Sequence, residues 1–108
     1  MPDSKFIVIL STAGSVDEAS KIAEHLVHSH LVACVNLIPG IQSFYWWNSS
    51  VQKDQEVLMI IKTDREKFDE VQRAILSLHS YEVPEIISIP LENGFNDYLQ
   101  WIEKALRV

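Results

Sequence analysis

The sequence has little of several residue types on which common catalytic and metal-binding motifs depend. Cys34 is the only cysteine, so an internal disulfide and a Cys-x-x-Cys metal or redox site are both excluded. The three glycines form neither a P-loop nor a Gly-rich dinucleotide-binding turn. Lys and Arg number 9 against 15 Asp and Glu, and they gather in no basic stripe, so we expect no nucleic-acid partner.

Long apolar runs and leader-like features are also missing. No apolar run approaches the ~18 residues that a membrane-spanning helix needs, and the first ten residues show no cationic start followed by a cleavage site. We therefore expect a cytoplasmic protein without a membrane partner. Because 47% of the 108 residues are hydrophobic and 22% are charged, the chain has enough apolar material for the core of a single domain, residues 1–108.

The hydrophobic pattern predicts four strands and three helices. The expected strands are 6–10, 31–38 with its continuation 41–47 beyond Pro39-Gly40, 51–62, and 85–91. The expected helices run from a capping box of Ser15 and Glu18 to Ser29, from a second box of Thr63 and Glu66 to Leu78, and from a cap at Asn96 to Leu106.

This order of elements predicts an α+β fold of the ferredoxin-like βαββαβ type with an additional C-terminal helix. In such a fold the sheet is antiparallel and both main helices cover one of its faces. A long hairpin is expected between 41–47 and 51–62, because residues 48–50 have turn chemistry. The other face of the sheet is left without a cover.

Four consecutive aromatic residues lie in the predicted hairpin. Phe44 and Trp46 should point to one side of the strand and Tyr45 and Trp47 to the other, so both faces are aromatic. The polar residues 52–55 are expected opposite them and offer no shelter. We therefore predict that all four rings lie in an oligomer interface. The alternative is that an indole of the hairpin packs onto the terminal helix of its own chain.

The turn after the second helix combines side chains that could hold a metal. His79, Tyr81, Glu82 and Glu85 supply an imidazole, a phenol and two carboxylates within a proline-bounded turn. The alternative is an ordinary helix end, with His79 at the negative end of the helix dipole and Glu82 in water. The spacing favours neither interpretation.

Two further polar sets have a structural explanation beside a functional one. His25, His28 and His30 could form a metal cluster, but their positions off the buried stripe of the helix favour a solvated surface. Glu56 and Lys62 share strand parity and therefore a face, where they either line a polar pocket or protect a strand edge.

No set of nucleophile, base and orienting group stands out, so no enzyme is predicted. The loop at 11–15 lacks the arginine with which an acylphosphatase of this fold would hold a phosphate.

Several segments together resemble the CutA divalent ion tolerance family along nearly the whole chain. The segments are 31–40, 43–47, 56–63, 81–85 and 98–101. The resemblance implies a tight homotrimer with strand pairing between subunits, similar in architecture to the PII signalling proteins. It also implies a cleft between subunits that is lined by Glu56, Lys62, Tyr81, Glu82 and Glu85, with Trp47 nearby.

The resemblance further implies metal-ligand positions that this sequence fills only in part. Members linked to copper tolerance have a cysteine and two consecutive histidines where this chain has Ser11, Leu78 and His79. A serine hydroxyl replaces thiolate poorly as a ligand of soft Cu(I), so tight copper binding through this set is not expected.

Two functions follow as expectations. The first is a non-catalytic trimer that takes part in the response to divalent metal ions and binds copper or zinc weakly through His79, Glu82 and Glu85, with no obligatory cofactor. The alternative is a PII-like signalling or scaffold protein that binds a small anionic ligand or a partner protein at the cleft between subunits. Lys62, which lies among apolar residues, motivates this alternative.

Overall fold

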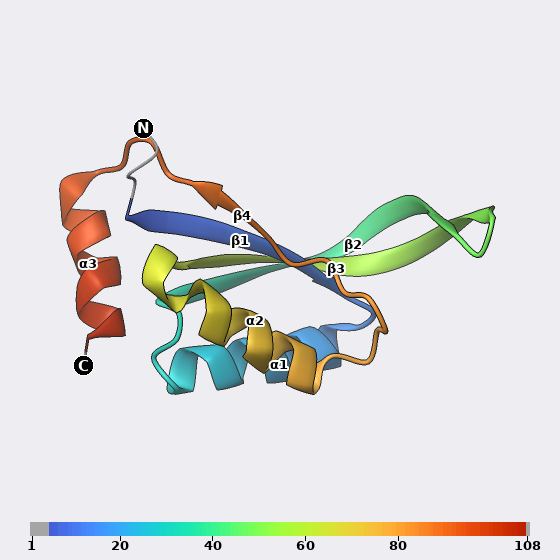
Figure 1. Cartoon of the computed structure of the whole chain (residues 1–108), viewed down its shortest axis with the longest axis horizontal. Coiled ribbons are helices and arrows are strands. Elements are labelled where there is room, and N and C mark those ends of the chain that lie inside the picture. The colour runs from blue at the N-terminus through green and yellow to red at the C-terminus, as the bar shows by residue number, and fades with distance from the viewer. Residues whose placement is uncertain (1–4, 108) are drawn as a thin grey trace.

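The structure is a computed structural model that describes residues 5–107. Its elements are β1 (Phe6–Ala13), α1 (Val16–His28), β2 (Cys34–Trp47), β3 (Ser50–Asp64), the 3-10 turn η1 (Arg65–Lys67), α2 (Phe68–Leu78), β4 (Ile87–Pro90) and α3 (Asn96–Leu106). The strands form one antiparallel sheet in the order β2-β3-β1-β4. Figure 1 shows α1 and α2 together beneath the sheet and α3 at the end opposite the hairpin tip. The predicted α+β fold is confirmed.

The main core lies between the sheet and the two long helices. Alternate residues of β1 and β3 point toward α1 and α2, and each large aliphatic side chain buried there contributes roughly 1.5–3 kcal/mol. The cluster comprises Ile7, Ile9, Ala13, Ala19, Ile22, Leu26, Val32, Val57, Met59, Ile61, Val71 and Ile75. None of the helices in residues 5–107 is long and apolar enough to cross a membrane.

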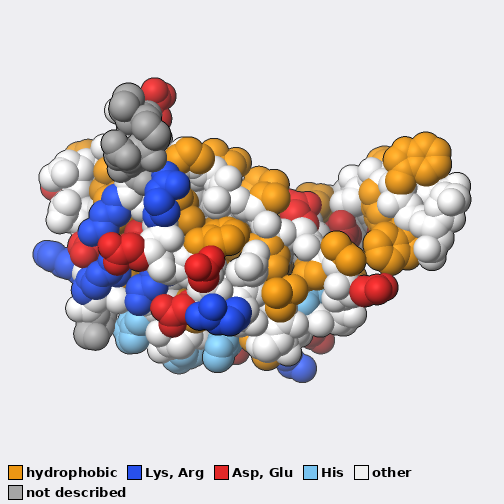
Figure 2. All heavy atoms as spheres, viewed as in Figure 1, with side chains coloured by type: hydrophobic (Ala, Val, Ile, Leu, Met, Phe, Trp, Pro, Cys, Tyr) orange, Lys and Arg blue, Asp and Glu red, His pale blue; other side chains and the backbone are white. Residues whose placement is uncertain are grey.

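The opposite side of the sheet, which we call the open face, is apolar and is uncovered within one chain except at the end that α3 closes. Ile38, Ile87 and Ile89 lie on it with 43%, 52% and 49% of their surface exposed. Apolar surface of this kind usually marks a contact with another molecule. In Figure 2 hydrophobic side chains are conspicuous along the upper part of the molecule and on the hairpin, while Lys and Arg gather at the other end.

One extra residue interrupts the regular pairing of β2 with β3. Ile38 pairs with Leu58, but the next pair is Ile41 with Glu56, so β2 advances by three residues while β3 advances by two. Gly40 has φ +79°, a conformation that glycine adopts readily, and this explains why the irregularity lies at the Pro39-Gly40 break. Residues 41–56 beyond this bulge form a two-stranded ribbon that extends past the helices (Figure 1).

The ribbon carries the four predicted aromatic residues. It turns at Asn48 and Ser49, whose φ angles of 51° and 67° fit a two-residue hairpin turn. The residues paired with 44–47 are 50–53 rather than the expected 52–55, a shift of two positions, because the turn is tighter than predicted. Trp46 is 73% exposed, and α3 lies at the far end of the molecule, so packing of the hairpin indoles onto that helix is wrong for a single chain.

The second predicted capping box is wrong. Thr63 is a buried strand residue whose hydroxyl donates to the carbonyl oxygen of Leu31 at 2.7 Å. Asp64 caps the following turn instead, since its Oδ1 accepts the backbone N–H of Lys67 at 3.1 Å. Strand parity explains the error, because it turns the Thr63 side chain toward the helices and away from the chain that follows.

Other element boundaries moved by a few residues. The strand after α1 begins at Cys34 rather than Leu31, because Leu31 still closes the helix through its N–H bond to the carbonyl of Leu26 at 3.1 Å. The last strand is limited to 87–90. Asn96 is the first residue of α3, and Phe95 occupies the N-cap position.

The end of the molecule opposite the ribbon is closed by α3. Ile102 and Leu106 of this helix pack with Ala33 in a small second core. The carboxylate of Asp64 is fully buried there and receives the guanidinium of Arg107 at 2.6 Å. The two groups form a charge-assisted bond that compensates the buried negative charge.

Candidate functional site

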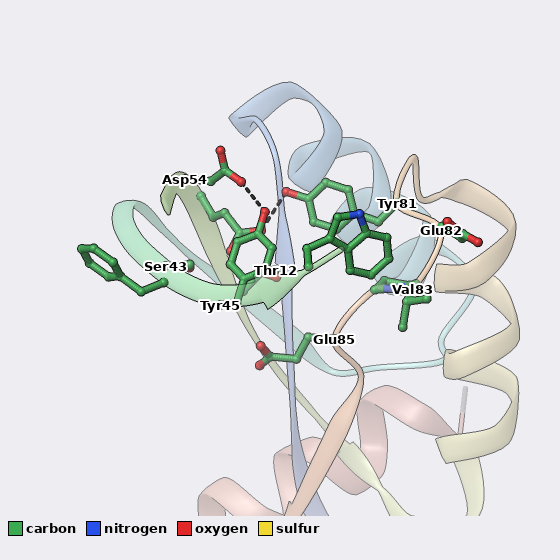
Figure 3. Close-up of a pocket in the computed structure, with 12 residues that line it drawn as sticks. Thr12, Ser43, Tyr45, Asp54, Tyr81, Glu82, Val83 and Glu85 are labelled. Atoms are coloured by element: carbon green, nitrogen blue, oxygen red, sulfur yellow. Dashed lines mark hydrogen bonds between the residues drawn. The ribbon is translucent and has the colours of Figure 1, made fainter. Parts of the chain in front are cut away.

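A hollow of about 750 Å³ lies on the open face where the ribbon leaves the rest of the sheet. One wall comes from the ribbon and the other from the turn between α2 and β4 (Figure 3). Its lining consists of Thr12, Ser43, Phe44, Tyr45, Trp47, Asp54, Glu56, Tyr81, Glu82, Val83, Pro84 and Glu85. The volume falls in the range of small-molecule binding sites.

The bulge determines which ribbon side chains reach the hollow. Without it, even-numbered residues of β2 would share a face with even-numbered residues of β3. Because β2 contains one extra residue, Ser43, Tyr45 and Trp47 lie on the same face as Asp54 and Glu56. Two aromatic rings and two carboxylates are thereby brought together by backbone geometry.

Two phenol–carboxylate hydrogen bonds organise the polar part of the hollow, and Figure 3 shows both as dashed lines. The hydroxyl of Tyr81 donates to Oε2 of Glu56 at 2.7 Å, and the hydroxyl of Tyr45 donates to Asp54. Burial, followed by the bond to Glu56, raises the pKa of Tyr81 above its usual value. The bond to Asp54 is the main cause of the raised pKa of Tyr45.

His79 holds the turn that carries Tyr81. Its Nε2 lies 2.7 Å from the carbonyl oxygen of Thr12, and its Nδ1 accepts the backbone N–H of Tyr81 at 3.1 Å. Since a carbonyl can only accept, Nε2 carries the hydrogen and the imidazole is neutral. The ring is fully buried, so both nitrogens are used for structure.

Glu18 fixes the same turn to the start of α1. Its Oε2 accepts the backbone N–H of Ser80 at 2.7 Å and its Oε1 that of Gly14 at 3.4 Å. Burial alone would raise the pKa of Glu18, but these bonds lower it below its ordinary value. Gly14 has little free space, because an added Cβ would lie 3.3 Å from the hydroxyl oxygen of Tyr81. The predicted cap is confirmed, since the hydroxyl of Ser15 accepts the N–H of Glu18 at 3.1 Å.

The hollow is negatively charged. Four of its residues are carboxylates, and among residues 5–107 none of those that line it is Lys, Arg or His. Lys62, expected in the same cleft, lies apart from it. It shares the face of Glu56 but is six residues away on β3, roughly 20 Å, and its ammonium group donates to Oδ1 of Asn36 at 2.5 Å.

The predicted metal ligands are not gathered within one chain. In the part of the chain from 5 to 107, no group of three His, Cys, Asp or Glu side chains is placed to hold a metal ion. Glu82 and Glu85 point in different directions in Figure 3. His25, His28 and His30 are exposed, and Nδ1 of His30 lies 3.0 Å from the carbonyl oxygen of Ala105.

Ser11 and Leu78 occupy positions at which the resemblance implies copper ligands, and they differ in burial. Ser11 is fully buried, and within residues 5–107 its hydroxyl has no hydrogen-bond partner. Leu78 is 43% exposed at the end of α2. Neither side chain offers a strong ligand, so His79 alone retains the implied chemistry, and its nitrogens are engaged in the turn.

Five residues of this region were not singled out from the sequence. Ser43 and Asp54 could have been found by combining strand parity with a bulge at Pro39-Gly40. Thr12 would follow from a longer first strand. Glu18 was interpreted only as a helix cap, and no pattern in the sequence connects Glu18 or Gly14 with a turn more than sixty residues later.

Comparisons with known proteins agree on one family. The family model for CutA1 divalent ion tolerance protein matches residues 7–105. A divalent-cation tolerance protein CutA from Archaeoglobus fulgidus is 43% identical over 98 residues, which are 91% of this chain and 95% of the relative. A solved structure described as the periplasmic divalent cation tolerance protein CutA from Archaeoglobus fulgidus matches with a TM-score of 0.91 at 42% identity, covering 94% of this chain and 98% of that one. A Thermus thermophilus structure described as divalent cation tolerance protein (Cut A1) is similar, with a TM-score of 0.88, 40% identity, and coverage of 90% and 94%.

Proposed function

Because the chain belongs to the CutA1 divalent ion tolerance family, we propose that it acts in the response to divalent metal ions as a non-catalytic homotrimer. In this proposal copper or zinc is bound weakly by the carboxylates of Glu82 and Glu85 at the rim of the hollow. His79 keeps the turn in place and contributes to binding through that turn.

The state of the two rim carboxylates supports the proposal. Glu82 and Glu85 are exposed, and no ion pair or hydrogen bond joins either of them to another of residues 5–107. They are therefore available without loss of an existing contact. Two carboxylates fill only part of the coordination shell of a metal ion, and the remaining coordination positions are left to water or to groups from another copy. The expected binding is therefore weak.

Calorimetric titration with copper and with zinc tests the metal part of the proposal. The double variant Glu82→Gln/Glu85→Gln should lose most of the heat of binding that the wild type gives. Glu24→Gln, an exposed position on α1, is the matched control for the change in charge. Unchanged binding by the double variant would remove the site.

The open face and the ribbon support self-association. Three isoleucines of the open face are substantially exposed in one chain, and so are Phe44 and Trp46, which lie on the face of the ribbon opposite Tyr45 and Trp47. Burying these side chains on other copies would remove a large apolar surface from water. Sedimentation at micromolar concentration should give a species three times the mass of the chain. A stable monomer would contradict the assembly, whatever the result of the metal titration.

The anionic-ligand alternative has less support. Its motivating residue, Lys62, does not line the hollow, and the carboxylates that do would repel an anion. A cytoplasmic location remains a prediction, which cell fractionation can check.

A further inference from the structure

Glu56 is a buried carboxylate for which the chain supplies no positive charge. Only 8% of the residue is exposed, and its one hydrogen-bond partner among residues 5–107 is the hydroxyl of Tyr81. None of the ion pairs in that part of the chain includes it. A buried charge is costly unless it is paired, and Glu56 borders an open hollow rather than a closed core.

The walls beside Glu56 are aromatic and apolar. Tyr45 and Trp47 lie on its own face of the ribbon, and Val83 and Pro84 belong to the opposite wall. Aromatic faces attract cations, and the attraction is strongest for tryptophan and in sites with little water. The hollow therefore combines an uncompensated anion with surfaces that suit both a cation and an apolar group.

We propose that this hollow binds an organic cation with a primary ammonium group. The ammonium group donates to the carboxylate of Glu56, and the apolar body of the ligand lies along the rings of Tyr45 and Trp47. The class of ligand is a small aryl- or alkylamine.

At Glu56, away from the rim carboxylates of the proposed metal site, the arrangement favours an ammonium ion over the two other ligand classes already considered. A divalent ion needs several oxygen ligands that converge on one point, and no such group of carboxylates is present in residues 5–107. An inorganic or organic anion would meet four carboxylates and no cationic side chain of the described lining. An ammonium ion needs only a few acceptors, because it is a compact charge with three donors.

The test compares three small molecules of the same shape and different charge. They are 2-phenylethylamine, a cation at pH 7, 2-phenylethanol, which is neutral, and phenylacetate, an anion. Binding to the intact assembly is followed by the shifts of the tryptophan indole N–H signals in NMR titrations. We expect the amine to bind about tenfold more tightly than the alcohol, and phenylacetate to bind more weakly than both.

Variants locate the effect. Glu56→Gln keeps an acceptor for Tyr81 and should reduce the preference for the amine to less than about threefold, whereas Glu24→Gln should leave the preference unchanged. Trp47→Leu should weaken the binding of the amine and of the alcohol together.

Three outcomes would each overturn the proposal. They are equal binding of amine and alcohol, a preference for the amine that survives Glu56→Gln, and no binding of any probe because another copy fills the hollow. Glu82→Gln/Glu85→Gln should retain amine binding even where it loses metal, so this proposal and the proposed metal site can fail separately.

Discussion

Two buried carboxylates on one strand differ in whether the described chain supplies a positive charge beside them. Asp64 and Glu56 lie on β3 eight residues apart, with the same parity and therefore facing the same side, roughly 27 Å from each other. Asp64 is fully buried and is paired with Arg107 at 2.6 Å, while it also caps the turn that follows β3. Glu56 is nearly as buried and meets only a phenol hydroxyl.

The difference separates the parts of the molecule that serve folding from those left for contacts. At the Asp64 end, α3 and its basic C-terminal turn complete the structure within one chain. At the Glu56 end, four carboxylates line the hollow without a cationic side chain among the described lining residues, and the aromatic rings of the ribbon are exposed. A buried charge for which the described chain supplies no opposite charge is an indication of function, and Asp64 on the same strand provides the comparison.

Removal of the cation at the Asp64 end should have the largest effect on stability. Arg107→Met leaves a buried charge unpaired, and because the guanidinium is partly exposed we expect a loss of about 2 kcal/mol in the free energy of unfolding. Urea denaturation at a fixed protomer concentration measures the loss. Lys104→Met removes an exposed charge from the same helix and should change stability by less than about 0.5 kcal/mol. Similar results for the two variants would show that the Arg107 pair is not needed.

Removal of the phenol that faces Glu56 should have a smaller effect. Tyr81→Phe deletes the only hydrogen bond to that carboxylate within residues 5–107, at an expected cost of about 1–2 kcal/mol. Because the pKa of Tyr81 is higher in the folded than in the unfolded chain, its contribution is fully present below pH 10 and is lost as the pH rises further. Absorbance titration at alkaline pH should show two late-ionising tyrosines, Tyr45 and Tyr81, one of which disappears in Tyr81→Phe while both persist in Tyr98→Phe. Persistence of both in Tyr81→Phe would contradict the assignment to Tyr81.

A third carboxylate tests compensation by backbone N–H groups. The folded chain lowers the pKa of Glu18, so its contribution is present above about pH 4.5 and is lost as the pH falls below the folded-state value. Glu18→Gln should therefore cost about 0.5–1 kcal/mol at pH 7 and progressively less below pH 4.5. Stability curves of this variant and of Glu24→Gln at several pH values measure the effect. A loss that does not depend on pH would point to packing rather than charge.

Neutralisation of Glu56 should have the smallest effect of the four. Glu56→Gln removes an unpaired buried charge and keeps an acceptor for Tyr81, so stability should stay within about 0.5 kcal/mol of the wild type or increase. Denaturation in the absence of amines measures it. A loss as large as that of Arg107→Met would mean that another copy of the chain already supplies the missing cation.

The sequence predicted the fold well where burial follows a regular period. The apolar runs of β1 and β3 and the central parts of the stripes of α1 and α2 agree with the structure because each element faces one core, whereas Val16, Val27 and Leu78 at the helix ends are exposed. The misplaced caps at Thr63 and Asn96 have another origin. A cap depends on the direction of one side chain, which neighbouring strands or helices can change, and a short motif does not contain that information.

The candidate site was predicted in part. Glu56, Tyr81 and Trp47 line one hollow of the single chain. Lys62, which the family resemblance placed with them in a cleft between subunits, lies further along the strand within the same chain, and the cleft itself stays a prediction. The role of His79 as a buried, neutral support could not be predicted, since it depends on the carbonyl of Thr12, which lies far away in sequence. The pairing of Asp64 with Arg107 likewise has no periodic signal.

The extra residue at Pro39-Gly40 makes the chemistry of the hollow depend on residue count as well as residue identity. The ribbon carries two ring pairs back to back, Tyr45 with Trp47 and Phe44 with Trp46, and only the spacing determines which pair is presented. Loss of Gly40 would exchange the two faces of this strand of the ribbon. Trp46 would then lie on the face of Glu56 in place of Trp47, and Phe44 in place of Tyr45. A change of length at this one position would thus change which rings line the hollow while the fold stays the same.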